Sequence, residues 1–168
     1  MTSNPILSGP WVEPEVIEID DLPLVVVRRE GVRIADLREI FDTSFGPVRQ
    51  AAEAAGLAVA GPAIAVYEGD PMEEFSLEVG HPVDRPLPAA VEVDGIAVVP
   101  TALTAGKVAV LTYLGPYDGL GEAWGRLMGW AHAQQLSPGS RYGEIYVTEP
   151  TPDGDPSQLR SDLFLTLR

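Results

Sequence analysis

Residues 106–135 read GKVAVLTYLGPYDGLGEAWGRLMGWAHAQQ, and residues 141–148 read RYGEIYVT. The apolar run at 106–114 predicts a β-strand. In 117–135, apolar residues recur at three- and four-residue steps, which predicts an amphipathic helix. Residues 141–148 and 162–168 alternate in the manner of two further strands. The C-terminal part of the chain therefore predicts the order β-α-β-β.

The N-terminal half predicts the same order. Residues 16–28 indicate a strand, and the Asp-Asp-Leu-Pro step at 20–23 predicts a bulge or bend within it. Apolar residues at helical spacing predict a helix over 34–56, with a kink or restart at its Gly-Pro step. Two strands, at 62–68 and 73–81, complete the unit.

The two β-α-β-β units are pseudo-repeats at about 15–81 and 105–168, within a single domain spanning 15–168. Residues 82–104 hold four prolines and are expected to be a connector in which only Ile96–Val99 is strand-like. Residues 1–14 show no periodicity and are expected to be a flexible lead-in. The segment TEPTPDGDPSQ, residues 148–158, predicts a solvent loop.

Composition narrows the choice of partners. The 168 residues include 25 acidic and 11 basic ones, a formal net charge of −14. This balance argues against direct binding of nucleic acid or of an anionic membrane, because both need a cationic surface. With no cysteine, disulfide scaffolds and thiolate metal sites are excluded. No signal peptide or membrane span is apparent, so we expect a cytoplasmic protein.

Most motifs for cofactors and metals are missing. The sequence around Lys107 does not match a phosphate-binding loop, and His81 and His132 lack metal-ligand spacing. Asp153 and Asp155 lack the later glutamate of a calcium loop. We therefore expect no cofactor and no metal.

The strand predicted at 141–148 carries a pattern that is typical of a ligand-binding surface. In residues 141–148 the side chains of Tyr142, Glu144 and Tyr146 share one face. Ile145 and Val147 take the other face, which we expect to be the one that a helix covers. On that basis the carboxylate lies on the face away from the helix.

The last strand extends this pattern. Its leucines are expected to face the core, whereas Phe164 faces away beside Thr166. If Phe164 shares the face of Glu144, aromatic rings surround a carboxylate, which suits a flat, apolar or cationic ligand. The alternative is an ordinary solvated strand face whose tyrosines serve β-propensity.

The motif Leu114-Gly115-Pro116-Tyr117-x2-Leu120-x3-Trp124-x2-Leu127-x2-Trp130, followed by Gly143-Glu144-Ile145-Tyr146-Val147, resembles the GyrI-like small-molecule-binding domain. Relatives form the effector-binding half of AraC- and MerR-type regulators, and others occur as stand-alone proteins. The resemblance spans about residues 15–168. No helix-turn-helix pattern is present, so we expect the stand-alone form.

The resemblance implies an α+β fold of duplicated β-α-β-β units. Two antiparallel sheets would form a concave ligand cleft, with a helix packed behind each. Glu144 would lie at the cleft floor, and Tyr113 stands where many relatives have a histidine. Together with the strand faces, this gives the expected ligand-binding residues: Glu144, Tyr146, Tyr142, Tyr67, Tyr113, Trp124 and Phe164.

Three functions stay open at this point. The first is a binding protein for a small hydrophobic, aromatic or cationic molecule. The second is a hydrolase of cyclopropane-bearing genotoxic natural products, as known in the family, with Glu144 as catalytic general base. The third is a protein-interaction module such as a gyrase inhibitor; nothing in the sequence beyond its acidity points to a protein partner.

Overall fold

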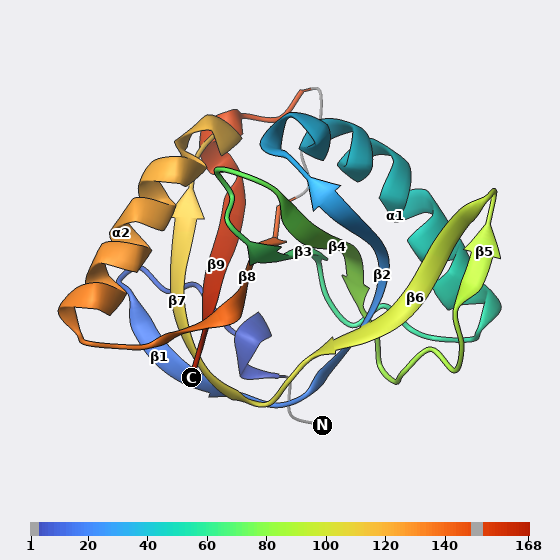
Figure 1. Cartoon of the computed structure of the whole chain (residues 1–168), viewed down its shortest axis with the longest axis horizontal. Coiled ribbons are helices and arrows are strands. Elements are labelled where there is room, and N and C mark those ends of the chain that lie inside the picture. The colour runs from blue at the N-terminus through green and yellow to red at the C-terminus, as the bar shows by residue number, and fades with distance from the viewer. Residues whose placement is uncertain (1–3, 149–152) are drawn as a thin grey trace. The chain divides into compact units, whose positions relative to one another are not determined.

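The computed structural model describes residues 4–148 and 153–168, and Figure 1 shows the course of the chain. Residues 149–152 of the expected loop at 148–158 lie outside the described residues. The two α-helices are α1 (Leu37–Ala54) and α2 (Leu120–Ala133). The strands are β1 (Glu15–Ile19), β2 (Leu22–Val32), β3 (Ala63–Gly69), β4 (Phe75–Pro82), β5 (Val91–Val93), β6 (Ile96–Leu103), β7 (Gly106–Leu114), β8 (Pro138–Tyr146) and β9 (Arg160–Leu167).

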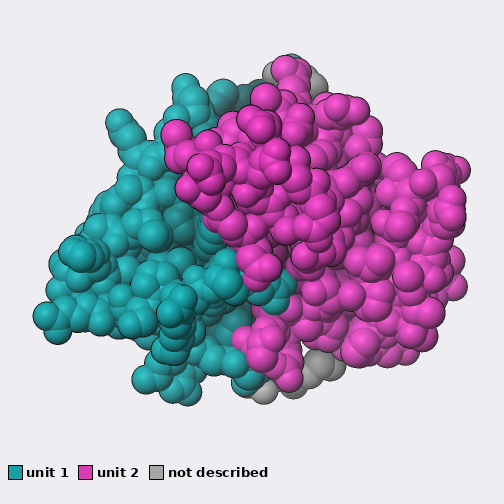
Figure 2. Space-filling view, in the orientation of Figure 1, with its two compact units in different colours: residues 1–20, 105–168 teal, residues 21–104 magenta. Residues whose placement is uncertain are grey.

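The chain divides into two compact units, which Figure 2 colours separately. One contains residues 1–20 and 105–168, and its strands are ordered β1-β7-β9-β8. The other contains residues 21–104, with the order β3-β4-β2-β6-β5. The strand pairs within both units are antiparallel, so the α+β class is confirmed.

Each unit contains the predicted order of strand, helix, strand, strand, as β7-α2-β8-β9 in one and β2-α1-β3-β4 in the other. In each of these sets the last strand lies between the other two strands. Thus β9 pairs with β7 and β8, and β4 pairs with β2 and β3. This shared connectivity is consistent with a duplication. The arrangement of two sheets about a concave cleft stays a prediction.

Helix α2 packs against the sheet of its own unit. Its buried residues Ala123, Leu127 and Ala131 contact buried side chains of β7 and β9. Leu163 and Leu165 of β9 belong to this cluster, as expected for the core-facing leucines. Burying this apolar stripe is the main force that holds the helix in place.

Helix α1 covers the sheet of the other unit in the same way. Val48, Ala51 and Ala52 pack with Val25 and Val27 of β2. The predicted helix over 34–56 is a 3₁₀ turn at Ile34–Asp36 followed by α1. Pro47 lies inside α1, which continues through the position where a kink or restart was expected.

Residues 16–28 form two strands of different units, where the sequence predicted one bent strand. β1 pairs with β7, whereas β2 pairs with β4 and β6. Asp20 and Asp21 therefore separate two strands, and no bulge within one strand is formed at this step. Residues 15–20 consequently belong to the unit that contains 105–168, and not to the first pseudo-repeat.

The expected connector at 82–104 contains the hairpin β5–β6, and its second strand is twice the length of the predicted strand-like piece. β6 pairs with β2 at Leu103 to Val99 and with β5 at Ile96 to Val98. Pro100 lies beyond the end of β5, where its missing N–H breaks no ladder between these strands. The sequence prediction therefore missed β5 and the second half of β6, because prolines interrupt the strand pattern of this segment.

The lead-in predicted to be flexible holds two buried side chains, Ile6 and Trp11. The Trp11 backbone is bonded to Thr112 on both sides: its N–H donates to the hydroxyl, and its carbonyl accepts from the Thr112 N–H. These contacts attach residues 4–14 to β7. Among the described residues, no helix is long and apolar enough to span a membrane.

Candidate functional site

Glu144 of β8 is 6 % exposed and accepts two hydrogen bonds from aromatic side chains. The indole Nε1 of Trp124 donates to its Oε2 at 2.7 Å, and the Tyr146 hydroxyl donates to its Oε1 at 2.6 Å. Hydrogen bonds to an ionised acceptor are stronger than those between neutral groups. The carboxylate is therefore held in a fixed orientation inside a largely aromatic environment.

Two aromatic pairs extend from this carboxylate. The rings of Trp124 and Tyr142 meet edge to face at 5.6 Å, and those of Tyr117 and Tyr146 do so at 5.8 Å. We call Glu144, Tyr142, Tyr146, Trp124 and Tyr117 the Glu144 cluster. Such edge-to-face pairs stabilise a fixed ring arrangement. The cluster therefore presents aromatic edges and faces around one carboxylate.

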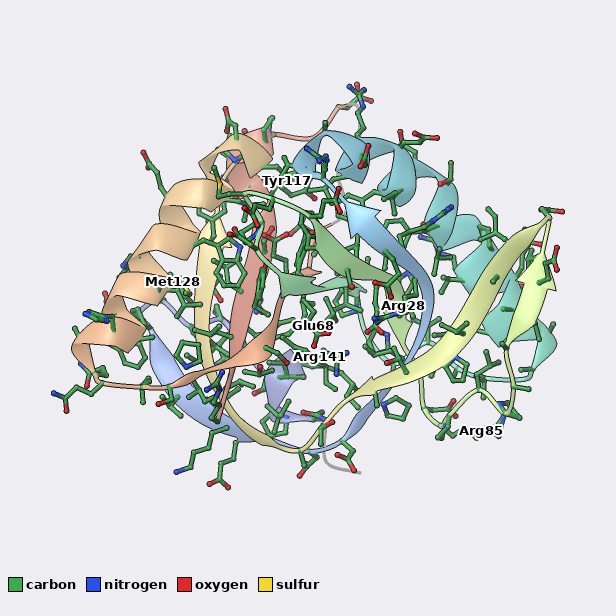
Figure 3. The ribbon with its side chains drawn as sticks, viewed as in Figure 1. Arg28, Glu68, Arg85, Tyr117, Met128 and Arg141 are labelled. Carbon is green, nitrogen blue, oxygen red and sulfur yellow. The ribbon has the colours of Figure 1, made fainter. Side chains whose placement is uncertain are left out.

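The pKa of the Tyr117 phenol is affected by the carboxylate of Glu144. Burial, and then the negative charge of Glu144, raise the pKa of Tyr117 above its ordinary value near 10. Tyr117 lies in the 3₁₀ turn before α2 and is labelled in Figure 3. Tyr117 is 40 % exposed, so the cluster reaches the surface of its unit at this residue.

The Gly-Pro-Tyr motif shapes the entry to α2. Gly115 has a φ of +142°, a conformation that side chains disfavour. The hydroxyl of Tyr113 donates to the carbonyl of Pro116, and a Cβ on Gly119 would lie 2.0 Å from that hydroxyl. The glycines thus let the turn close onto Tyr113, and this places Tyr117 and Trp124.

The expectation that the helix covers the face opposite Glu144 is wrong. Glu144 lies opposite Leu163 in the β8–β9 register, and Leu163 packs under α2. Trp124 of α2 reaches the carboxylate directly. The error arose because Ile145, on the other face, is also buried, so alternation of polarity does not show which face the helix takes.

The structure places the seven expected residues unevenly. Glu144, Tyr142, Tyr146 and Trp124 come together, and Tyr113 lies one strand further away, opposite Ser161. Phe164 is 1 % exposed and pairs with Gly143, so it is on the face opposite Glu144. That corrects the alignment assumed for Phe164. A ligand-binding role for these residues stays a prediction.

Tyr67 belongs to the other unit. It is buried on β3, where its ring meets Phe75 edge to face at 5.5 Å. In register it lies opposite Leu77, as Tyr146 lies opposite Ser161. Its assignment to the ligand site stays a prediction.

Comparison with known proteins identifies the family. The model of the GyrI-like small molecule binding domain matches residues 12–168. The chain belongs to this family. None of the curated proteins compared with it matches.

Solved structures share the GyrI-like fold. The C-terminal domain of EcmrR is 15 % identical, with a TM-score of 0.74, covering 93 % of this chain and 97 % of that one. A hydrolase from Listeria innocua is 12 % identical, with a TM-score of 0.61 and coverages of 96 % and 94 %. SAV2435 bound to tetraphenylphosphonium is 11 % identical, with a TM-score of 0.64 and coverages of 94 % for both chains. At these identities the likeness shows the fold alone.

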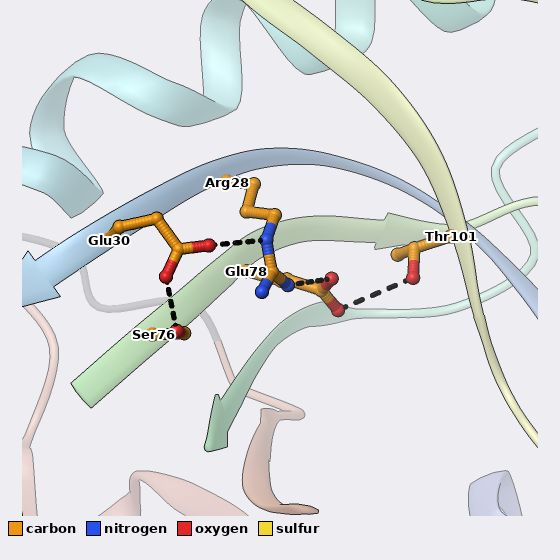
Figure 4. Close-up of polar contacts among 5 residues, drawn as sticks. All are labelled: Arg28, Glu30, Ser76, Glu78 and Thr101. Carbon is orange, nitrogen blue, oxygen red and sulfur yellow. Dashed lines mark hydrogen bonds and ion pairs between the residues drawn. The ribbon is translucent and has the colours of Figure 1, made fainter. Parts of the chain in front are cut away.

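A second polar cluster of this GyrI-like domain was not predicted from the sequence (Figure 4). Arg28 of β2 donates to the buried Glu78 at 2.8 Å and to Glu30 at 3.0 Å. The Ser76 hydroxyl, and then the charge of Arg28, lower the pKa of the exposed Glu30. Because Arg28 is already paired with two carboxylates, this cluster is best explained as a stabilising network on the sheet.

A metal site would have to be built from the acidic and histidine side chains of the described residues. Among them no three His, Asp or Glu side chains gather closely enough to hold an ion. The Glu144 cluster itself offers one carboxylate, three phenols and an indole. These groups can pair with a cation, stack on flat rings and donate or accept hydrogen bonds.

Proposed function

We propose that this GyrI-like domain binds small aromatic or hydrophobic cations at the Glu144 cluster. The observation that carries the proposal is the carboxylate of Glu144, buried and bonded to Trp124 and Tyr146. A cation that contacts this buried carboxylate gains an ion pair that water and salt screen far less than a pair at the surface. The surrounding rings add cation–π contacts of about 0.5–2 kcal/mol each.

Two further facts support a cationic ligand. The chain carries a net charge of −14, which raises the local concentration of cations. A related structure, SAV2435, holds tetraphenylphosphonium, a hydrophobic cation. That ligand is a suitable first probe for this chain.

The test compares two probes of the same shape and opposite charge, tetraphenylphosphonium and tetraphenylborate. By calorimetry, we expect the wild type to bind the cation and to reject the anion. Glu144→Gln should weaken binding of the cation by about tenfold or more, since the ion pair is lost. Glu122→Gln, an exposed site on α2 with the same change in charge, is the control and should bind as wild type does.

Glu144→Gln should leave the fold intact. The amide oxygen can accept from Trp124 Nε1, and the amide nitrogen can donate to the Tyr146 hydroxyl, which is able to accept as well as donate. We expect the free energy of unfolding to change by less than about 1 kcal/mol. A large loss of stability with unchanged binding of the cation would show that Glu144 is structural and would contradict the proposal.

Hydrolysis is the second candidate, because the Glu144 carboxylate lies against a phenol and a related structure is described as a hydrolase. In this case Glu144 acts as general base on water and Tyr146 orients the substrate. Incubation with a cyclopropane-bearing genotoxin distinguishes the two functions. Turnover that Glu144→Gln abolishes, with binding retained, would identify an enzyme.

A further inference from the structure

Ser161 of β9 is a fully buried polar residue that the proposed function does not use. Its side chain is 0 % exposed, and its hydroxyl has no hydrogen-bond partner among the residues that the structure describes. Nearly all buried polar groups in proteins are hydrogen-bonded, because an unsatisfied one costs free energy. This hydroxyl therefore requires an explanation.

The position of Ser161 connects it to the Glu144 cluster. In the strand register it lies opposite Tyr146 on one side and opposite Tyr113 on the other. It precedes Leu163 by two positions, and Leu163 lies opposite Glu144. Residues two apart on a strand share a face, so Ser161 is on the face of Glu144 and α2.

The other unit provides an internal comparison. There, the central strand β4 carries Leu77 opposite Tyr67, in the place that Ser161 takes opposite Tyr146. Leu77 is fully buried and apolar. A leucine therefore satisfies the packing of this position in one unit, and packing alone does not account for a smaller, polar serine in the other.

We propose that the Ser161 hydroxyl is a hydrogen-bonding site for a polar atom of the ligand. It would make the domain prefer aromatic cations that carry a hydroxyl or amino group over onium ions that have none. This inference rests on the proposed function of the Glu144 cluster and specifies its ligand class. Serine can donate or accept, so both kinds of group fit.

The contacts of Tyr146 provide a route to Ser161. The Tyr146 hydroxyl occupies Oε1 of Glu144, and its ring is the cross-strand neighbour of Ser161. A cation that pairs with Oε1 takes the place of this hydroxyl. The ring still contacts Tyr117, and a shift of both rings would let a polar substituent of the ligand reach Ser161.

The test uses tetraphenylphosphonium and its analogue with one 4-hydroxyphenyl ring, which differ by a single hydroxyl. By calorimetry, wild type should bind the hydroxylated cation about three- to tenfold more tightly, the value of one hydrogen bond. Ser161→Ala should abolish this preference while leaving the affinity for tetraphenylphosphonium unchanged or higher. A preference that survives in Ser161→Ala would overturn the inference.

Thermal melting without ligand tests the premise separately. Ser161→Ala removes an unsatisfied hydroxyl and should raise the melting temperature by about 2–4 °C. Ser44→Ala is the control: Ser44 is equally buried, but its hydroxyl donates to the Ile40 carbonyl, so its loss should not raise the melting temperature or alter the ligand preference. An unchanged or lower melting temperature for Ser161→Ala would show that the hydroxyl is satisfied within the fold and would overturn the inference.

The two proposals fail in different ways. If wild type binds neither cation, or binds both independently of Glu144, the proposed function is wrong and the inference falls with it. If binding depends on Glu144 but the hydroxylated analogue has no advantage, only the role of Ser161 is wrong.

Discussion

The phenol of Tyr117 can report on the charge of Glu144. Burial and the neighbouring carboxylate raise its pKa above the ordinary value near 10. Removing the charge with Glu144→Gln should lower this pKa part of the way back, because burial remains. Absorbance at alkaline pH follows the phenolate directly, and Tyr117→Phe identifies which of the tyrosine transitions belongs to this residue.

The raised pKa of Tyr117 also predicts how the free energy of unfolding changes with pH. The folded state keeps the Tyr117 proton at a pH where the unfolded chain loses it, so unfolding becomes easier as pH rises. This contribution to stability is fully present below about pH 10, the unfolded pKa, and is lost as pH rises through the folded pKa. A Tyr117 transition that is identical in wild type and Glu144→Gln would show that the carboxylate does not act on this phenol.

Sequence patterns identified part of the Glu144 cluster at the level of residues. Strand alternation brought Tyr142, Glu144 and Tyr146 together, and the family resemblance added Trp124. Tyr117 was not predicted as a site residue, because its ring contact with Tyr146 depends on how the turn before α2 packs. Ser161 could not be identified either, since a missing partner is visible only in three dimensions.

The turn into α2 depends on a glycine with no room for a side chain. A methyl group at Gly119 would lie 2.0 Å from the Tyr113 hydroxyl, far inside contact distance. Gly119→Ala should therefore destabilise the domain by about 1–3 kcal/mol, as overpacking does, and should weaken binding of tetraphenylphosphonium by displacing Tyr117. Chemical denaturation and calorimetry measure the two effects.

Gly125 provides the matched control on the same helix. A methyl group there would meet nothing within 4 Å. Gly125→Ala should stabilise the domain by about 0.5–1 kcal/mol, because alanine favours a helix. Equal effects of the two substitutions would contradict the close approach between Gly119 and Tyr113.

Elements with strong periodicity were predicted well, and those near prolines were not. The helical spacing in 117–135 identified α2, whose apolar stripe is buried as expected. β6 was underestimated because Pro100 interrupts its pattern, yet the proline falls where one side of the strand has no partner in β5. The division between β1 and β2 depends on which strands they pair with, and a local pattern does not contain this information.

The acidity of the whole chain should act differently from the one buried carboxylate. The net charge of −14 attracts cations over distances comparable to the Debye length, which falls from about 20 Å at 0.02 M salt to about 4 Å at 0.5 M. A direct contact with Glu144, at 6 % exposure, lies away from the screening ions. Salt should therefore weaken the attraction between the net negative charge and a cation, and should have little effect on a cation in contact with Glu144.

This difference leads to a measurable ratio. Tetraphenylphosphonium should bind more weakly at 0.5 M than at 0.02 M salt in both wild type and Glu144→Gln, because the charge of −14 changes only to −13 in the variant. The ratio of their dissociation constants should stay the same within about twofold, since the ion pair inside the cluster is screened much less than surface charges. If the ratio instead falls to one at high salt, Glu144 acts only as one more member of the general acidic field, and the cation does not contact its carboxylate.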